Sequence, residues 1–331
     1  MLPSIKYKAF VVEESEGKYL GGVVEKDTKD LPENEVLIRV HYSSVNYKDA
    51  LSATGNKGVT KHYPHTPGID AAGEVVSSNV EQYKAGDEVI VTGYDLGMNT
   101  PGGWGQYVSV PTSWVVKLPE GLSMKEAMIL GTAGFTAGIS ISRLAEYVKP
   151  DDGAVLVSGA TGGVGSVALS ILSKLGYETV AISRKETEYE YLKALGANQI
   201  LPLDDFLALD NKPVLSAQYA GGIDTIGGKA LENMIKTTKL YGAVTTCGSV
   251  SGTNLSLSVF PFILRGIALL GVSAQNYPGN LREPLWQKLA GDWKPVNLLE
   301  IYKEVALTDL NEVVQSILAG KLKGRTVVSL A

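Results

Sequence analysis

The sequence contains a single cysteine, Cys247, and only three histidines among its 331 residues. One cysteine cannot form an intrachain disulfide, and it excludes zinc sites built from four cysteines. The composition suits a reducing compartment, so the default expectation is a cytoplasmic protein. The net charge is −5 and the basic residues do not cluster, so we expect no nucleic-acid partner.

Long apolar runs are also lacking. The longest, such as 267–274, are far too short to span a bilayer, and the charged segment 1–30 does not resemble a secretory signal. We therefore expect no membrane partner. What is present is an ordinary globular composition, 44% hydrophobic and 20% charged, over a length that suits two domains.

The first third of the chain has the pattern of short strands separated by Gly and Pro turns, which predicts a partly closed β-barrel. Segments 123–131 and 132–148 then have helical patterns, and Ser123 with Glu126 has the spacing of a capping box. From residue 154 strands and helices alternate, which predicts a doubly wound parallel sheet of about six strands. The expected barrel strands are 35–42, 74–77, 88–92 and 106–110, and the expected sheet strands are 154–159, 179–184, 199–203, 223–226, 243–247 and 268–273.

Beyond residue 273 this alternation stops. Segments 281–289 and 310–318 have helical patterns, and 326–330 has the pattern of a last strand. Because it follows a completed sheet, this strand could rejoin the first domain.

A glycine-rich turn follows the strand expected at 154–159. Ala160 to Gly165 has the spacing A-x-G-x-x-G, with Ala160 where the common fingerprint has its first glycine. Gly162 would let the backbone approach a pyrophosphate, and Gly165 would let the next helix pack on the strand. Free N–H groups at the start of the helix would face the phosphates. The segment therefore predicts a dinucleotide site formed by Thr161, Gly162, Gly163, Val164 and Gly165.

The second strand of this unit ends in Ser183, Arg184 and Lys185, 18 to 20 residues after Gly165. An NAD enzyme usually places Asp or Glu there to bind the ribose hydroxyls. Two cations and a hydroxyl suit a 2′-phosphate instead, so the sequence favours NADPH.

Several segments resemble the medium-chain dehydrogenase/reductase superfamily, in that superfamily's order. They are 45–50 (VNYKDA), 67–74 (PGIDAAGE), 86–90 (GDEVI), 131–137 (GTAGFTA) and 159–165 (GATGGVG). The segments 46–49, 131–137 and 261–265 most resemble a zinc-free branch that holds bacterial acryloyl-CoA reductases, often labelled quinone oxidoreductases. The resemblance implies a GroES-like catalytic domain at 1–128 and 275–331 around a Rossmann NADPH-binding domain at 129–274.

The resemblance also bears on metal. Zinc-dependent members carry an early Cys and a Gly-His-Glu motif, where this chain has Asn46 and Ile69-Asp70. A catalytic zinc needs about three protein ligands, so we expect none. What remains is hydride transfer to an activated acceptor, and the branch points to the C=C bond of a short enoyl thioester. Hydrogen-bond donors must then stabilise an enolate-like oxygen.

Tyr47 is the first candidate for that chemistry, since the matching tyrosine of branch members lies by the cofactor. Asn46 is a second donor, and Lys48 with Asp49 could form a local ion pair. Tyr63 and Arg265 are candidate substrate contacts, although packing is the better explanation of Tyr63. Lys321, Lys323 and Arg325 form a basic cluster that would suit a CoA nucleotide, or a solvated turn. Further expected cofactor contacts are Thr136, Cys247, Gly248, Ser249 and Ser273.

Three functions remain open on sequence alone: an enoyl-thioester reductase, a quinone or enone reductase, and a non-enzymatic NADPH-binding protein. In each case the partner is a small molecule. Zinc-free relatives commonly pair through the last Rossmann strand, here 268–273, which would otherwise be an exposed apolar edge. We therefore expect a homodimer.

Overall fold

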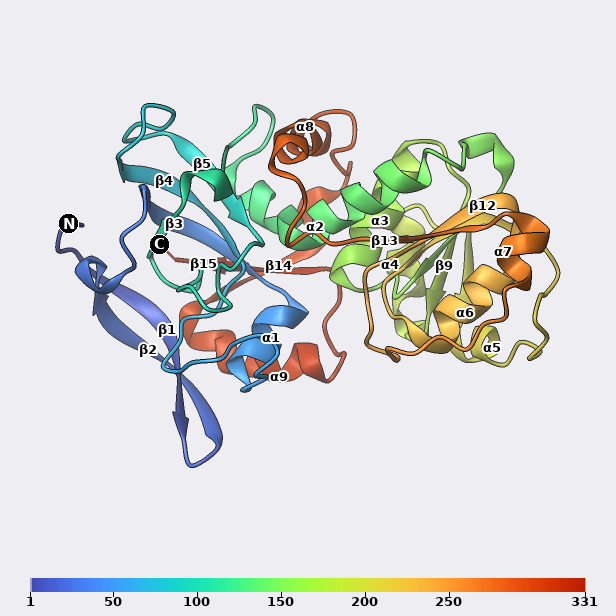
Figure 1. Cartoon of the computed structure of the whole chain (residues 1–331), viewed down its shortest axis with the longest axis horizontal. Coiled ribbons are helices and arrows are strands. Elements are labelled where there is room, and N and C mark those ends of the chain that lie inside the picture. The colour runs from blue at the N-terminus through green and yellow to red at the C-terminus, as the bar shows by residue number, and fades with distance from the viewer. Residues whose placement is uncertain (1, 331) are drawn as a thin grey trace. The chain divides into compact units, whose positions relative to one another are not determined.

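The computed structural model describes residues 2–330, which divide into two compact units (Figure 1). Unit 1 comprises Met1–Thr132, Gln275–Gly291 and Leu298–Ala331, and unit 2 comprises Ala133–Ala274 and Asp292–Asn297. Each unit has its own sheet, as the change from a barrel-like to an alternating pattern in the sequence predicts.

Unit 1 is built on a seven-stranded sheet in the order β14-β15-β3-β4-β5-β7, with β6 also paired to β3. The chain end returns to this sheet, because β15 pairs antiparallel with β3 through Thr326 opposite Val45. The predicted β-rich first domain and its late strand are thus confirmed. The strands are β3 (Val36–Val45), β4 (Asp70–Ser78), β5 (Glu88–Thr92), β6 (Tyr107–Val110), β7 (Val115–Lys117), β14 (Tyr302–Ala306) and β15 (Arg325–Ser329).

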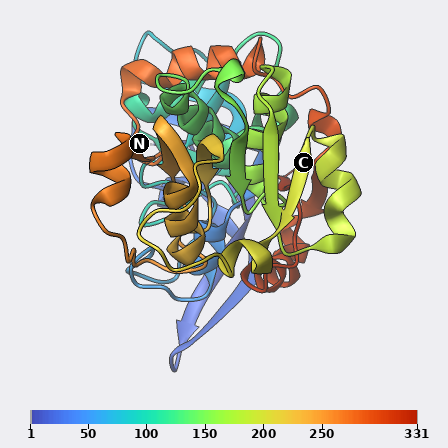
Figure 2. The ribbon, with the colours of Figure 1, turned by 90° about the vertical axis from the view of Figure 1, so that its right-hand side faces the viewer.

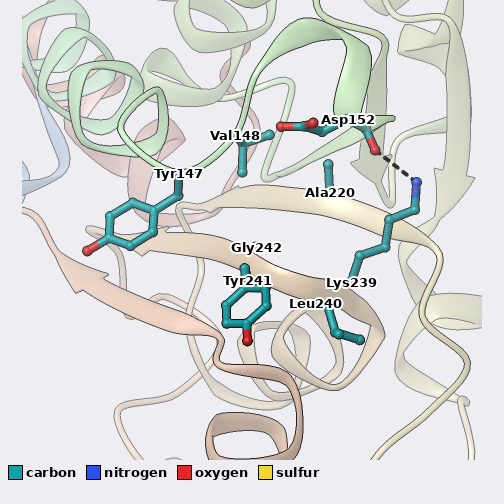
Figure 3. A pocket seen from close by; sticks show the side chains of 8 residues that line it. All are labelled: Tyr147, Val148, Asp152, Ala220, Lys239, Leu240, Tyr241 and Gly242. Atoms are coloured by element: carbon teal, nitrogen blue, oxygen red, sulfur yellow. Dashed lines mark hydrogen bonds between the residues drawn. The ribbon is translucent and has the colours of Figure 1, made fainter.

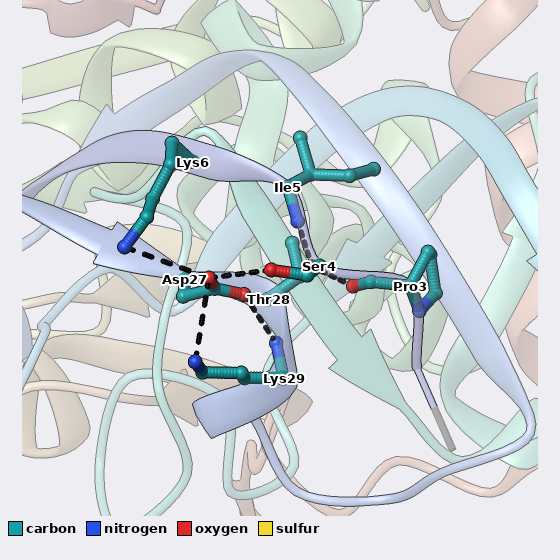
Figure 4. A network of polar contacts seen from close by, with 7 residues as sticks. All are labelled: Pro3, Ser4, Ile5, Lys6, Asp27, Thr28 and Lys29. Atoms are coloured by element: carbon teal, nitrogen blue, oxygen red, sulfur yellow. Dashed lines mark hydrogen bonds and ion pairs between the residues drawn. The ribbon is translucent and has the colours of Figure 1, made fainter.

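A long hairpin, β1 (Lys6–Ser15) with β2 (Lys18–Asp27), was not predicted. Most of β2 is exposed or half-buried, so its sequence carries little of the apolar alternation that identifies strands. Polar contacts close the open end of the hairpin (Figure 4). Asp27 accepts from Ser4 Oγ at 2.7 Å and lies 3.6 Å from Lys6 Nζ. The hydrogen bond from Ser4, and then that from Lys29 N, lower the pKa of Asp27.

Helix α2 (Met124–Leu144) contains one non-helical residue, Gly131, at φ 51° and ψ −157°. The two helices predicted on either side of residue 131 are therefore correct. Ser123 and Glu126 also form the predicted capping box, with Ser123 N donating to Glu126 at 2.9 Å. Among the described residues only α2 is long and apolar enough to cross a membrane, but 83% of its apolar window is buried inside the protein.

Unit 2 contains a fully parallel six-stranded sheet in the order β10-β9-β8-β11-β12-β13, with helices packed along it (Figure 2). This is the predicted doubly wound arrangement, and the number of strands is as expected. The strands are β8 (Val155–Ser158), β9 (Thr179–Ser183), β10 (Gln199–Pro202), β11 (Tyr219–Asp224), β12 (Thr238–Thr246) and β13 (Ala268–Gly271). The remaining α-helices of the chain are α1 (Tyr47–Ala53), α3 (Gly163–Lys174), α4 (Tyr189–Ala194), α5 (Leu203–Leu207), α6 (Gly228–Thr237), α7 (Phe260–Arg265), α8 (Gly279–Ala290) and α9 (Leu310–Leu318).

Strand β11 begins at Tyr219, four residues before the predicted start at residue 223, and it includes Gly221 and Gly222. A Cβ at Gly221 would lie 2.5 Å from the Ala243 carbonyl oxygen, and one at Gly222 would lie 2.2 Å from Met234 Sδ. These glycines permit close packing rather than ending the strand, which the sequence pattern alone does not distinguish.

A shallow pocket of about 270 Å³ lies in unit 2 among Tyr147, Asp152, Lys239 and Tyr241 (Figure 3). Lys239 Nζ donates to the Asp152 carbonyl at 3.0 Å across it. Lys239 and Tyr241 belong to the amino-terminal half of β12. Ligands of doubly wound sheets bind at the carboxyl ends of the strands, so the pocket is at the opposite end from the expected cofactor site.

Candidate functional site

The glycine-rich turn joins β8 to α3 as predicted. Its backbone is tight: a Cβ at Gly165 would lie 2.4 Å from the Gly159 carbonyl oxygen and 2.8 Å from Ala160 Cα. Gly162 is the N-cap of α3 and no side chain caps the helix. The first N–H groups of α3, beginning at Gly163, therefore remain available to an anion.

Buried hydrogen bonds fix this turn to the neighbouring strands. Asp224, at the end of β11, accepts from Ser158 Oγ at 2.8 Å and from Thr246 Oγ1 at 2.9 Å. It also accepts from Gly227 N at 3.0 Å. Burial raises the pKa of Asp224, and these hydrogen bonds oppose the rise. Because Ser158, Asp224 and Thr246 each end a strand, one carboxylate ties together three strand ends at the edge that carries the turn.

The other predicted cofactor residues follow strand ends at that same edge. Ser183 ends β9, and its Oγ accepts from Lys185 N at 3.0 Å. Arg184 is 66% exposed and its Nε lies 3.4 Å from Asp204. Because the sheet is parallel, these residues share an edge with the segments after β12 and β13. Those segments contain Cys247, Gly248, Ser249 and Ser273.

The structure also shows the surroundings of three other predicted cofactor contacts, two threonines and the cysteine. Thr161 is buried within the glycine turn, and Thr136 is buried in α2, where its carbonyl accepts from Ser140 Oγ at 2.9 Å. Burial, with a further effect of Asp224, raises the pKa of Cys247 to about 12. The thiol stays protonated near neutral pH, which agrees with a packing or contact role rather than nucleophilic chemistry.

Unit 1 contains a buried polar network that begins at Asn46, the N-cap of α1. Asn46 Nδ2 donates to Asp70 at 2.8 Å and lies 3.2 Å from Asp49 Oδ2. Asp70 also accepts from Ser44 Oγ at 2.6 Å and from Thr132 N at 2.9 Å. The amide of Asn46 is thus occupied inside the protein, which points to a role in positioning rather than in donating to a substrate.

Arg325 supplies the positive charge of this network. Its guanidinium donates to Ser44 Oγ at 3.0 Å, to Asn46 Oδ1 at 3.3 Å and to the Ile129 carbonyl at 2.8 Å. The proposed exposed basic cluster at 321–325 is therefore wrong for Arg325, which is 3% exposed. Gly131 leaves room for the network, because a Cβ there would lie 2.6 Å from Asp70 Oδ2.

Asp49 is a second buried carboxyl group of this network. It accepts from Asn46 N at 2.7 Å and from Ile69 N at 2.8 Å. Burial, and then the charge of Asp70, raises its pKa to about 7. The expected ion pair between Lys48 and Asp49 is absent from the described residues; Lys48 Nζ instead donates to Gln275 Oε1 at 2.6 Å.

Tyr47 begins α1 and its side chain is 40% exposed. Within residues 2–330 its hydroxyl has no hydrogen-bond partner, so it is accessible to a ligand, as its predicted role requires. Tyr63 differs: its hydroxyl donates to the Ser52 carbonyl at 2.5 Å, and its ring packs edge-on against Tyr19. Tyr63 therefore has the packing role that the sequence favoured.

Arg265 does not lie where a substrate contact was expected. Its guanidinium donates to the carbonyls of Lys236 and Thr238, at 2.9 and 3.1 Å, and to that of Leu215. Thr238 is the first residue of β12, so this arginine is at the amino end of the strand, opposite the ligand edge. It fixes backbone carbonyls, and we do not retain it as a substrate residue.

Sequence reasoning missed Ser44, Asp70, Thr132, Asp224 and Arg325 as parts of these networks. The available signal was Asp70 itself, a carboxylate between the apolar residues Ile69 and Ala71 at the start of β4, which requires buried partners. Within residues 2–330 no group of three His, Cys, Asp or Glu side chains is placed to hold a metal ion.

Comparisons with known families agree with this architecture. The sequence model of the alcohol dehydrogenase GroES-like domain matches residues 32–120, and that of the zinc-binding dehydrogenase matches residues 163–291. YhfP of Bacillus subtilis (strain 168), provisionally named a quinone oxidoreductase, is 43% identical over 92% of each chain. The acrylyl-CoA reductase AcuI of Ruegeria pomeroyi is 40% identical over 98% of this chain and 99% of its own.

Solved structures are equally similar. The YhdH oxidoreductase of Salmonella enterica, in complex with NADP, superposes with a TM-score of 0.95 at 40% identity, over 98% of this chain and 100% of that one. Bacillus subtilis YhfP with NAD bound also gives a TM-score of 0.95, at 41% identity and with the same coverage. The likeness extends over both units of the chain.

Proposed function

Because the chain belongs to the medium-chain dehydrogenase/reductase superfamily, we propose that it reduces the C=C bond of a short enoyl thioester, such as acryloyl-CoA, with NADPH and without zinc. The observation that carries this proposal is the dinucleotide-type turn before α3. Gly165 has no room for a side chain, and no side chain caps that helix. The 40% identity to an acrylyl-CoA reductase over 98% of this chain supports the choice of substrate.

The residues present fit the nicotinamide dinucleotide. Gly162 and the first N–H groups of α3 would hold the pyrophosphate, where any side chain at Gly165 would collide with the turn. Ser183, Arg184 and Lys185 would hold the 2′-phosphate, since positions 183–185 at the end of β9 contain neither Asp nor Glu to select a free ribose. Structures of two relatives at 40% identity contain NADP or NADPH, and that of a third contains NAD, so the choice of NADPH rests on the first two and on these three residues.

The bound cofactor would supply a hydride for the β carbon of the substrate. Tyr47 is the accessible phenol of the α1 turn, and we assign it to contact the nicotinamide ribose or the acyl group and to supply a proton directly or through water. Asn46 holds this turn in place through Asp70 and Arg325. The buried network thus fixes the turn from which Tyr47 projects.

The test is a panel of acceptors followed by NADPH oxidation. We expect kcat/KM for acryloyl-CoA to exceed that for a naphthoquinone. The reverse order would support the alternative, a quinone or enone reductase, which the name of the Bacillus subtilis relative favours. Tight NADPH binding without turnover of any acceptor would indicate a binding protein and overturn the proposal.

We propose that two copies of the chain pair through β13. This strand ends the sheet, and among the described residues only β12 pairs with it. Exposed apolar side chains gather on the neighbouring segments, including Ile263 and Leu264 on α7 and Tyr241 on β12. An open apolar edge is normally covered, and a second identical edge would cover it. A monomer mass in solution scattering would contradict this assembly.

The remaining assignments rest on composition. A small molecule is the expected partner, and neither nucleic acid nor membrane is proposed, because the net charge is −5 and the one long apolar helix within residues 2–330 is mostly buried. A single cysteine suits a reducing compartment, so we place the reaction in the cytoplasm.

A further inference from the structure

Lys48 lies in the first turn of α1, beside Tyr47, and it is half-buried. Its only hydrogen-bond partner among residues 2–330 is the neutral Gln275 Oε1, at 2.6 Å. Gln275 is itself held firmly, because its carbonyl accepts from Tyr94 N at 2.9 Å and from Arg282 Nη2 at 3.0 Å. The ammonium is therefore fixed in position by an amide that does not neutralise it.

The neighbouring carboxylate does not neutralise this charge either. Asp49 is the charged group of its own helix that acts on Lys48, and its two oxygens accept from Asn46 and Ile69. Burial lowers the pKa of Lys48, which Asp49 only partly opposes. Because the pKa of Asp49 is raised to about 7, this carboxyl is also partly protonated near neutral pH.

A half-buried cation whose hydrogen-bond partner is neutral lowers the stability of the fold. Such charges are commonly found at functional sites, where a ligand interacts with them. Structural lysines are usually solvated or paired with a carboxylate, as Lys117 is with Asp87 at 3.2 Å. An ammonium carries three N–H donors, and Gln275 takes one of them. Two donors and most of the positive charge thus remain available on the residue that follows Tyr47 in the first turn of α1.

We propose that the Lys48 ammonium donates a hydrogen bond to the carbonyl oxygen of the thioester and stabilises the negative charge that develops there during reduction. This inference rests on the proposed function. The hydride electron pair forms a new C–H bond at the β carbon. The π electrons of the C=C bond then form a double bond between the α carbon and the carbonyl carbon. The carbonyl pair moves onto oxygen, and the enolate then takes a proton at the α carbon from Tyr47 or water. Lys48 keeps its own proton throughout.

The test compares Lys48→Met, which removes the charge, with Lys48→Arg, which retains it. Removing one donor of this kind typically lowers kcat about 10²- to 10³-fold, and we expect that loss for Lys48→Met with acryloyl-CoA. Lys48→Arg should recover kcat to within about tenfold of the wild type, since a guanidinium also stabilises an oxyanion. The NADPH dissociation constant should stay unchanged in both variants, which shows that the fold and cofactor site are intact.

The pH profile separates an electrostatic role from a structural one. In the wild type kcat should fall at alkaline pH as the Lys48 ammonium deprotonates, with a midpoint below the usual lysine value of 10.5 because burial lowers its pKa. In Lys48→Arg the alkaline midpoint should move to higher pH, since arginine stays charged. The control is Lys117→Met, whose lysine is exposed and paired with Asp87, and which should leave kcat unchanged.

An unchanged kcat in Lys48→Met would overturn the inference, as would an alkaline midpoint that is the same in Lys48→Arg and the wild type. If Lys48→Met does not fold, Lys48→Gln is measured in its place against the same outcomes. A wild type that reduces neither enoyl thioesters nor quinones would overturn the proposed function as well. An active wild type with an equally active Lys48→Met would overturn only the role of Lys48.

Discussion

Substituting Gly165 by alanine tests the glycine turn with a single methyl group. The added Cβ would lie 2.4 Å from the Gly159 carbonyl oxygen and 2.8 Å from Ala160 Cα, whereas ordinary contacts begin at 3.4 Å. Both obstacles are backbone atoms, so neither can rotate away. The difference, 3.4 − 2.4 = 1.0 Å, is the distance by which the start of α3 and the turn must separate.

That displacement is large compared with the tolerance of a hydrogen bond. An N–H···O contact near 2.9 Å becomes roughly 3.9 Å, which is no longer a hydrogen bond. Each charge-assisted bond to a phosphate contributes about 1.5–3 kcal/mol. Losing one therefore raises the NADPH dissociation constant roughly ten- to a hundredfold.

The assay is a calorimetric titration of NADPH into wild type and Gly165→Ala, with the melting temperature of each recorded. Gly22→Ala is the matched control, because a Cβ at Gly22 meets nothing within 4 Å. We expect the control to bind as the wild type does. A folded Gly165→Ala protein with wild-type affinity would refute the assignment of the pyrophosphate to this turn.

Three further predictions address the charges of the two units. Arg184→Ala should lower kcat/KM for NADPH by roughly tenfold and leave the value for NADH unchanged, because one charge-assisted bond to the 2′-phosphate is lost; equal losses for both cofactors would contradict this. Arg325→Met should lower the free energy of unfolding by about 3–5 kcal/mol in urea denaturation, because the Ile129 carbonyl and Ser44 Oγ would lose their charged donor and the buried Asp70 would lose a nearby positive charge; a loss under about 1 kcal/mol would contradict it. The raised pKa of Asp49, about 7, means that protonation favours the folded state, so its contribution to stability is present at low pH and is lost as the pH rises through about 7. The melting temperature of the wild type minus that of Asp49→Asn should therefore fall between about pH 4 and pH 8, and a rising difference would contradict the sign.

Local patterns predicted much of the fold because they have local causes. The end of one helix and start of another at Gly131, the capping box at Ser123 and the strand–turn–helix at Ala160 each depend on a few adjacent residues. Where a segment lacks such a pattern, as in the exposed β2, prediction failed.

The buried networks could not be predicted, because their members are distant in the sequence. Arg325 reaches Ser44 and Asn46, which precede it by 281 and 279 residues, and its burial follows from the return of β15 to β3. In the sequence Arg325 lies close to Lys321 and Lys323, so the three residues had the pattern of an exposed basic cluster. Arg265 was misplaced for a related reason: the sequence gives its distance along the chain from β12, but not which end of that strand it meets.

The central claim is that the chain transfers hydride from NADPH to the β carbon of an enoyl thioester. The direct measurement is to incubate the protein with acryloyl-CoA and NADPH doubly deuterated at the redox carbon of the nicotinamide, and to locate deuterium in the product by mass spectrometry and NMR. The account predicts propionyl-CoA with a single deuterium, at the β carbon. Propionyl-CoA without deuterium at that carbon, or acryloyl-CoA left unreduced while the cofactor is bound, would contradict it.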